Sequence, residues 1–388
     1  MPVSNSIRAA APEIAEWRRD FHRNPELLYD VHRTASVVAE KLRAFGLDRV
    51  ETGIGRTGVV GVLHGRAGAG TRTVALRADM DALPIHEITG KPWSSAVPGK
   101  MHACGHDGHT AMLLGAARQL AETRAFEGTI VFIFQPAEEG GGGARTMLED
   151  GLLDRFPFDE VYGLHNMPGL DVGRFAIRPG PIMAAADVFR IDLEGRGGHA
   201  AKPHATIDPV LVGSHIVTAL QSIVSRTVDP LSAAVVSVTE FHAGDTSNVI
   251  PQTAWLGGTV RTLDAGVRSF IEERLRHIVA STAAVFGATA EVGYRRGYPV
   301  TVNDPRAARF AADVARKVVG DAAVSETADP MMGAEDFAYF LERRPGAYIF
   351  MGNGPSAGLH HPAYDFDDEA IAYGSSWWVA LAEEALAR

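Results

Sequence analysis

Short apolar segments alternate with a helical pattern between residues 55 and 165, and this alternation constrains the fold more than any other feature. The stretch 110–124 carries apolar residues at the three- and four-residue spacing of a helix. The segments that read as strands are 58–65, 73–79, 129–135 and 160–165. Strands that alternate with helices form a mostly parallel sheet with helices packed against its faces. We therefore expect an α/β fold for this part of the chain.

The pattern changes near residue 184. Segments 187–195, 233–241, 254–262 and 288–294 are typical of strands, and 208–226 and 267–287 are typical of helices. Their order is βαββαβ, which is the order of a ferredoxin-like α+β unit. A helix at 304–320, a strand at 347–353 and a C-terminal helix then continue the first pattern. The expected organisation is one α/β domain made of residues 1–183 and 297–388, with a second domain, 184–296, inserted into it.

The composition excludes several classes of protein. One cysteine in 388 residues forms no internal disulfide and fits a reducing compartment. The net charge is −10 without a basic block, so nucleic acid is not an expected partner. No run of about 18 apolar residues is present, and the N-terminal stretch lacks the apolar core of a signal peptide. We expect a cytoplasmic protein that binds neither nucleic acid nor membrane.

Three of the expected strands end in side chains that bind metals or carry protons. These side chains are Asp79 and Asp81, Glu138 and Glu139, and His165. In open α/β sheets, ligands bind beyond the carboxyl ends of the strands. We therefore expect the five side chains to meet at one rim of the sheet.

The stretch "MHACGHDGH", residues 101–109, contains the single cysteine and precedes the expected helix at 110. Cys104 and His106 are two residues apart, so both side chains point the same way in an extended loop. Thiolate, imidazole and carboxylate together form a ligand set for divalent metals. The helix N-terminus is expected to lower the pKa of the thiol and favour the thiolate. The alternative is that Cys104 is a small buried apolar side chain.

The adjacent acids Glu138 and Glu139 repel each other unless a cation offsets their charge. One carboxylate is then expected to bind metal and the other to act as a general base on metal-activated water. The alternative is a solvated turn, because four glycines follow the pair.

Further candidates are ambiguous by themselves. The pair His360 and His361 follows a strand and a glycine-containing loop, so it can return to the same rim. Glu335 and Asp336 lie near the start of an expected helix, where the helix dipole explains acidic residues without a function. The inserted domain offers His199 and His204 in a glycine-rich loop, with Asn248 and Arg261 further along.

Seven segments taken together resemble one family, the co-catalytic metallohydrolases of the aminoacylase and carboxypeptidase type. The match is to its amidohydrolase branch, which includes hippurate hydrolases, N-acyl-amino-acid amidohydrolases and auxin-conjugate hydrolases. The resemblance runs from about residue 12 to the C-terminus, with the segments in the same order as in the family. The segments are "ALRADMDALPI", "MHACGHDGHTAMLLGAA", "FQPAEEGGGGARTMLEDG", "GLHNMP", "GGHAAKPH", "MGAEDFAYF" and "GLHHPAYDFD".

The resemblance implies a zinc-peptidase-like catalytic domain, an inserted lid or dimerisation domain, and a homodimer or dimer-based oligomer. It implies two divalent metal ions, manganese or zinc, with nickel or cobalt as further options. The implied metal ligands are Cys104, His106, Glu139, His165 and His361. Many relatives in the wider family have histidine where this chain has Asp79, so we do not carry a ligand role to Asp79.

The resemblance also implies roles for side chains that do not bind metal. Glu138 corresponds to the general base, and Asp81 to the acid that orients a ligand histidine. His199 corresponds to a residue that reaches across a dimer to the carbonyl of the scissile bond, while Asn248 and Arg261 correspond to contacts with the substrate carboxylate.

The expected activity is metal-dependent hydrolysis of the amide bond of N-acyl amino acids, which yields a carboxylic acid and a free amino acid. A dipeptidase and an N-acetyl-diaminopimelate deacetylase are alternatives within the same chemistry. A metal-binding protein without catalysis, such as a sensor, leaves Glu138 without a role. A cysteine hydrolase with Cys104 as the nucleophile would have to work without metal.

Overall fold

A computed structural model describes residues 3–387 and divides into two compact units. Unit 1 runs to Ile182 and includes Val302–Asp329 and the chain from Asp336 onward. Unit 2 consists of Met183–Thr301 together with the short segment Pro330–Glu335. That short segment lies outside the inserted range expected from the sequence, 184–296.

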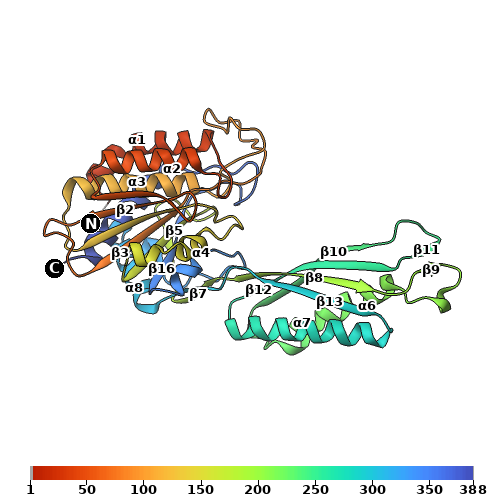
Figure 1. Ribbon diagram of the computed structural model, residues 1–388. Helices are drawn as coiled ribbons and strands as arrows, with labels where there is room; N and C mark the ends of the chain where they lie inside the picture. Colours follow the sequence, from red (N-terminus) through yellow and green to blue (C-terminus); the bar gives the residue numbers. More distant parts are fainter. Residues whose placement is uncertain (1–2, 388) are drawn as a thin grey trace. The chain divides into compact units, whose positions relative to one another are not determined.

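Unit 1 is built on an eight-stranded sheet (Figure 1). Its strands in spatial order are β1 (Arg49–Ile54), β2 (Gly58–His64), β4 (Thr129–Gln135), β3 (Thr73–Asp79), β5 (Glu160–Met167), β16 (Gly346–Gly352), β6 (Phe175–Ala176) and β15 (Val324–Ser325). The four central strands β4, β3, β5 and β16 are parallel. Strand β1 pairs antiparallel with β2, β2 with β4, and β6 with β16, whereas β15 pairs parallel with β6. The mostly parallel α/β sheet expected from the sequence is confirmed.

Helices cover both faces of this sheet. One face packs with a continuous hydrophobic cluster to which five helices contribute. These helices are α1 (Asn5–Arg23), α2 (His32–Ala44), α3 (His106–Thr123), α8 (Pro305–Val319) and α10 (Ala370–Ala385). Figure 1 shows α4 (Gly143–Glu149) on the other side of the sheet. The remaining helical segments of unit 1 are α5 (Leu152–Arg155), α9 (Ala338–Leu341) and the 3-10 turn η3 (Asp321–Ala323).

Parallel strands bring residues from distant parts of the chain to one rim. Strand β3 ends at Asp79, which pairs in register with Gln135 at the end of β4. His165 lies near the end of β5, the other neighbour of β3. The start of α3, at His106, follows the loop that leaves β3. The polar strand ends therefore converge because the sheet is parallel, as the sequence predicted.

Unit 2 is a ferredoxin-like α+β unit. Its antiparallel sheet has the order β10-β12-β8-β13, and two helices follow the first and third of its strands along the chain. The elements are β8 (Ala185–Glu194), α6 (Pro209–Ser222), β10 (Ala234–Ala243), β12 (Thr253–Thr262), α7 (Ala265–Val285) and β13 (Thr289–Arg296). Alternate residues of β8 are buried, because one face of the sheet packs against the helices in a second hydrophobic cluster.

Short elements complete the description. In unit 2, β9 (Gly198–His199) pairs with β11 (Val249–Ile250), and η1 (Pro203–Ala205) and the π-turn η2 (Ile223–Thr227) flank α6. Strands β7 (Gly180–Met183) and β14 (Thr301–Asn303) lie where the chain passes between the units. None of the helices within residues 3–387 combines the length and the apolar character that crossing a membrane requires.

Candidate active site

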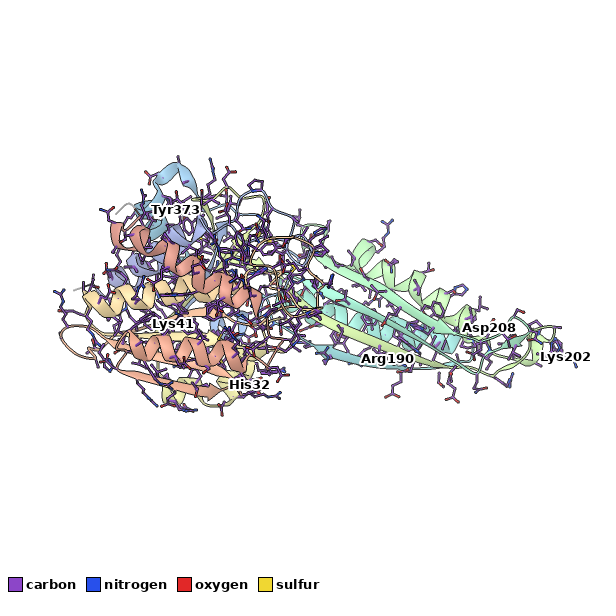
Figure 2. The ribbon with its side chains drawn as sticks, turned by 90° about the horizontal axis from the view of Figure 1, so that it is seen from above. His32, Lys41, Arg190, Lys202, Asp208 and Tyr373 are labelled. Atoms are coloured by element: carbon purple, nitrogen blue, oxygen red, sulfur yellow. The ribbon has the colours of Figure 1, made fainter. Side chains whose placement is uncertain are left out.

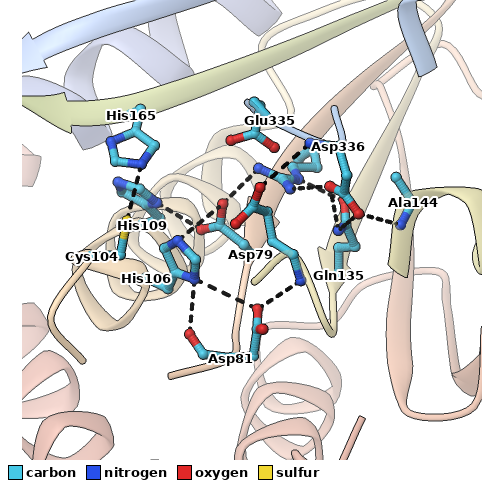
Figure 3. Close-up of polar contacts among 12 residues, drawn as sticks. Asp79, Asp81, Cys104, His106, His109, Gln135, Ala144, His165, Glu335 and Asp336 are labelled. Carbon is cyan, nitrogen blue, oxygen red and sulfur yellow. Dashed lines mark hydrogen bonds and ion pairs between the residues drawn. The ribbon is translucent and has the colours of Figure 1, made fainter. Parts of the chain in front are cut away.

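A glycine turn places the first two candidate ligands. Gly105 separates Cys104 from His106 and adopts a left-handed conformation with φ of 86°, at the point where α3 begins. A Cβ atom at Gly105 would collide with the side chains of Asn166 and Tyr364. Glycine is therefore required here by both the backbone conformation and the available space. Cys104 and His106, both labelled in Figure 3, hold their ligand atoms within 4.8 Å of each other.

His106 is oriented by the loop that follows β3. Its Nδ1 lies 2.8 Å from the backbone oxygen of Asp81, while its buried Nε2 has no hydrogen-bond partner among residues 3–387. Burial opposes a positive charge on the ring, but the carboxylates of Asp79 and Asp81 outweigh it and raise the pKa of His106 to about 10. The negative field that retains this proton would equally favour a metal cation in its place.

Cys104 and His165 face each other across the rim. The Cys104 sulfur lies 3.5 Å from Nε2 of His165, whose Nδ1 donates to the backbone oxygen of Asn166 at 2.6 Å. Burial lowers the pKa of His165, so the ring is in the neutral form that binds metals.

The thiol of Cys104 differs from the sequence expectation. Burial, reinforced by the negative charges of Glu139 and Glu138, raises the pKa of Cys104 well above its ordinary value. The expected lowering by the helix N-terminus is therefore wrong, because desolvation and the nearby acids dominate. A thiolate at this position requires a bound cation to displace the proton.

The two adjacent acids lie on a tightly held loop between β4 and α4. The Asp81 carboxylate accepts hydrogen bonds from the backbone nitrogens of Glu138, at 2.9 Å, and Glu139, at 3.1 Å. Ala137, directly before them, has φ of 54°, which is strained for a residue other than glycine. Glu138 is only 6% exposed, so this loop is not the solvated turn of the alternative interpretation.

Of the two C-terminal histidines, His360 is the one that lies beside Glu139. Its backbone nitrogen donates to the oxygen of Ala103 at 2.8 Å, and its Nε2 lies 3.3 Å from Oε1 of Glu139. His361 instead accepts a hydrogen bond at Nδ1 from the backbone of Ala363. The left-handed backbone at His360, with φ of 62°, turns the two neighbours in different directions. The structure thus brings His360 to the cluster in place of the expected His361.

The donor atoms fall into overlapping groups that fit metal ions. Cys104, His106 and His165 form one group with ligand atoms within 4.8 Å of one another, and Cys104, Glu139 and His360 form another. A third group joins His106 to Glu138 and Glu139. The buried Nε2 of His106 has no hydrogen-bond partner among the described residues. Sulfur, imidazole and carboxylate donors, with a buried imidazole nitrogen left unpaired, suit divalent metals.

His109 and Asp79 contact the residues that carry the donors, which agrees with a supporting rather than a ligand role for His109 in the sequence. Nδ1 of His109 donates to Oδ1 of Asp79 at 2.6 Å, and its Nε2 accepts from the backbone nitrogen of Asn166 at 3.0 Å. Both ring nitrogens are therefore engaged, and His109 fixes the strand end that carries His165. Burial opposes ionisation of Asp79, but His106 and the buried Arg77, 2.6 Å away, lower its pKa well below the ordinary value.

Comparison with known proteins decides the family. The model of peptidase family M20/M25/M40 matches residues 75–384. The chain belongs to this family. It is therefore a hydrolase of amide bonds, and the resemblance read from the seven sequence segments is confirmed.

Relatives of this M20/M25/M40 peptidase match over nearly its whole length. The hippurate hydrolase of Campylobacter jejuni is 42% identical over 370 residues, which cover 95% of this chain and 96% of the relative. The N-acetyl-L-cysteine deacetylase of Bacillus subtilis is 41% identical over 372 residues, covering 95% and 87%. Among solved structures, the YXEP protein of Bacillus subtilis, a dinuclear metal binding peptidase of family M20, aligns with a TM-score of 0.86, 36% identity and coverage of 98% and 99%.

Three candidate residues of this family member lie in unit 2. His199 is exposed on β9, and its Nδ1 accepts from the backbone of Ala201 at 3.0 Å. Its backbone oxygen accepts at 2.8 Å from the backbone nitrogen of Lys202, which Figure 2 labels. Asn248 is exposed next to it, since its backbone oxygen accepts from Ala200 at 3.0 Å. Arg261 is half-buried on β12, where it donates to the backbone oxygen of Val260 at 3.1 Å. The structure thus brings His199 and Asn248 together and places Arg261 elsewhere in the unit.

Proposed function

We propose that the protein is a dinuclear metal-dependent amidohydrolase that cleaves N-acyl amino acids into a carboxylic acid and a free amino acid. The observation that carries this proposal is a cluster of metal donors, buried at Cys104, His106 and His165 and open to solvent at His360, with one further buried carboxylate, Glu138, beside it. The names of the relatives support the substrate class, since hippurate and N-acetylcysteine are both N-acyl amino acids.

The proposed metal ligands are Cys104, His106, Glu139, His165 and His360. Cys104, His106 and Glu139 each belong to more than one donor group, so the five residues could hold two ions close together. Manganese or zinc fits this mixture of donors, and nickel or cobalt are further options. When bound, two such ions supply Lewis acidity toward the amide carbonyl and lower the pKa of water.

Glu138 is the proposed general base. It takes the proton of the attacking water and returns that proton to the nitrogen of the leaving amino acid. Asp81 holds the backbone of Glu138 through a 2.9 Å hydrogen bond, so the base is placed by a buried neighbour rather than by a mobile loop. A carboxylate that is fixed in this way loses little entropy in the reaction.

Unit 2 is proposed to complete the site of a second copy in a homodimer. His199 would donate a hydrogen bond to the developing oxyanion, a contribution typically worth about 3–4 kcal/mol. Asn248 and Arg261 would bind the carboxylate of the amino acid product, because amide and guanidinium groups suit that anion. The exposure of His199 and Asn248 leaves them available for such contacts.

Metal removal and a substrate panel test the proposal together. A chelator should abolish hydrolysis of hippurate and N-acetyl amino acids, and manganese or zinc should restore it. Dipeptides should be poorer substrates, and a reversed preference would favour a dipeptidase. Full activity in a preparation shown to be free of metal would overturn the proposal and favour the alternative in which the Cys104 thiol is the nucleophile.

The variant Glu138→Gln tests whether Glu138 acts as the general base rather than as a metal ligand. This variant should retain its metal, because Glu138 is not among the proposed ligands, and should lose at least about 100-fold in kcat. Near-normal turnover with both ions bound would remove Glu138 from the role.

A further inference from the structure

Asp336 is a buried acid that the proposed chemistry does not use. It lies in "MGAEDFAYF" and is fully shielded from solvent. Helix α9 begins two residues later and contains only four residues. An acid at the start of so short a helix gains little from the helix dipole. The position of Asp336 therefore needs another explanation.

The carboxylate of Asp336 bonds to both ends of the loop that carries Glu138. Its oxygens accept from Nε2 of Gln135, the last residue of β4, at 2.8 and 2.9 Å. Its Oδ2 also accepts from the backbone nitrogen of Ala144, in the first turn of α4, at 2.9 Å. Gly142 offers α4 no side chain as a cap, so Asp336 supplies the missing acceptor from almost 200 residues away.

Two further contacts fix this arrangement. Nη2 of Arg77 donates to Oδ1 of Asp336 at 3.0 Å, and the Arg77 Nε donates to Oε1 of Gln135 at 2.8 Å, which orients the Gln135 amide. The backbone nitrogen of Asp336 lies 3.4 Å from Oε1 of Glu138. Asp336 therefore touches the loop at its start, at its end and at the base itself.

We propose that Asp336 is a positioning residue for Glu138, holding the Gln135–Ala144 loop closed so that the base keeps its place. The inference rests on the proposed role of Glu138. Asp81 holds the middle of the loop through the amides of Glu138 and Glu139, and Asp336 holds its two ends. A base displaced by about 1 Å is expected to lose up to about 100-fold in rate without a matching change in substrate affinity.

The primary test is Asp336→Asn, which keeps the size of the side chain but removes its charge and one acceptor oxygen. We expect kcat to fall about 10- to 100-fold, with KM within about 3-fold of wild type and both ions retained. Hydrogen exchange of peptides from residues 135–144 should rise, because the loop ends are released. Asp304→Asn is the matched control, since Asp304 accepts backbone bonds at the start of α8, and it should leave kcat and the exchange of that loop unchanged.

A double variant separates this inference from the proposed function. If Asp336 acts through Glu138, Asp336→Asn should cause little further loss in the Glu138→Gln background. The positioning role would be overturned if the losses of kcat in the two single variants multiplied in the double variant. It would also be overturned if Asp336→Asn alone kept the wild-type kcat and the wild-type hydrogen exchange of the loop. An active Glu138→Gln enzyme would instead overturn the proposed base. Gln135→Met, which removes donors to Asp336 while keeping the side-chain volume, provides a second route should Asp336→Asn fail to fold, and it should reproduce both the kcat loss and the faster exchange.

Discussion

At the scale of single residues, the structure and the sequence pattern indicate different metal ligands at the C-terminal histidine pair. His360 lies 3.3 Å from Glu139, whereas His361 bonds to the backbone of its own turn. We therefore predict that His360→Asn loses affinity for at least one metal ion by more than about 100-fold, beyond the 10- to 100-fold typical of supporting residues. Calorimetric titration of the metal-free protein, with elemental analysis of the product, measures this loss.

His361→Asn is the matched control for that experiment. It changes the same residue type one position later and should still bind two ions with wild-type affinity. The reverse result, with His361→Asn impaired and His360→Asn intact, would restore His361 as the ligand.

At the scale of elements, the start of α3 depends on a single glycine. Gly105 and Gly99 both have positive φ, 86° and 77°, but a Cβ atom at Gly99 would meet nothing within 4 Å. Gly99→Ala should cost only the backbone strain, about 1–2 kcal/mol. Gly105→Ala should cost about 1–3 kcal/mol more, because its Cβ would also collide with Asn166 and Tyr364. Urea unfolding of the two variants measures the difference, and equal costs would show that the space around Gly105 does not matter.

Helix α1 is tied to α3 by a buried charge network that makes stability depend on pH. Nδ1 of His22 lies 2.8 Å from Asp107, its Nε2 lies 3.3 Å from Glu87, and Arg18 adds a positive charge nearby. Burial opposes the charge on His22, but Asp107 outweighs it and the pKa rises to about 9. Burial likewise opposes ionisation of Glu87, yet the hydrogen bond from His22 lowers its pKa to about 2.

The signs of these two shifts define a pH window. A raised pKa means that His22 stabilises the fold fully below about pH 6.5 and that this contribution is lost as the pH rises through about 9. A lowered pKa means that the contribution of Glu87 is present above about pH 4.5 and is lost as the pH falls through about 2. The stabilisation from this pair is therefore greatest between about pH 4.5 and 6.5.

His22→Asn tests the upper side of this window. Urea unfolding of the metal-free protein at pH 6, 7.5 and 9 should show a decline in wild-type stability, of roughly 3 kcal/mol at most, that is largely absent in the variant. His32→Asn is the control, because His32 is exposed on α2 and should leave the decline in place. Parallel pH profiles for wild type and His22→Asn would contradict the assignment.

Features that depend on neighbouring residues could be predicted from the sequence, whereas contacts between residues far apart in the chain could not. Strands β2 to β5 and β16 were predicted because each is a buried apolar run, but β1 is an edge strand with mixed exposure and lacks that signal. Among the proposed metal donors, Glu139 and His165 follow from the strand ends of a parallel sheet, and Cys104 and His106 from the stretch at the start of α3. The contacts of Asp336 join residues about 200 positions apart, and no local pattern encodes them. The two adjacent histidines are of the same type, and only their contacts in the fold distinguish His360 from His361.

At the scale of the whole molecule, the proposed homodimer predicts that two inactive variants can restore each other's activity when they are mixed. If His199 serves the site of a second copy, each site contains Glu138 from one chain and His199 from the other. Variants Glu138→Gln and His199→Ala should each be nearly inactive alone. Random exchange of subunits makes half of the dimers mixed, and one site in each mixed dimer is then intact, so activity should recover to about one quarter of wild type.

The experiment is to mix the two variants, dissociate them mildly and allow the subunits to reassociate before hippurate hydrolysis is assayed. Sedimentation analysis establishes that dimers have formed, and metal analysis shows that both variants carry their ions. Glu138→Gln mixed with a Glu138→Gln, His199→Ala double variant is the control, since no combination of those chains contains an intact base. Dimers that reassociate without recovering activity would show that His199 does not act across the interface, because the mixed species would then contain every residue that the proposal requires.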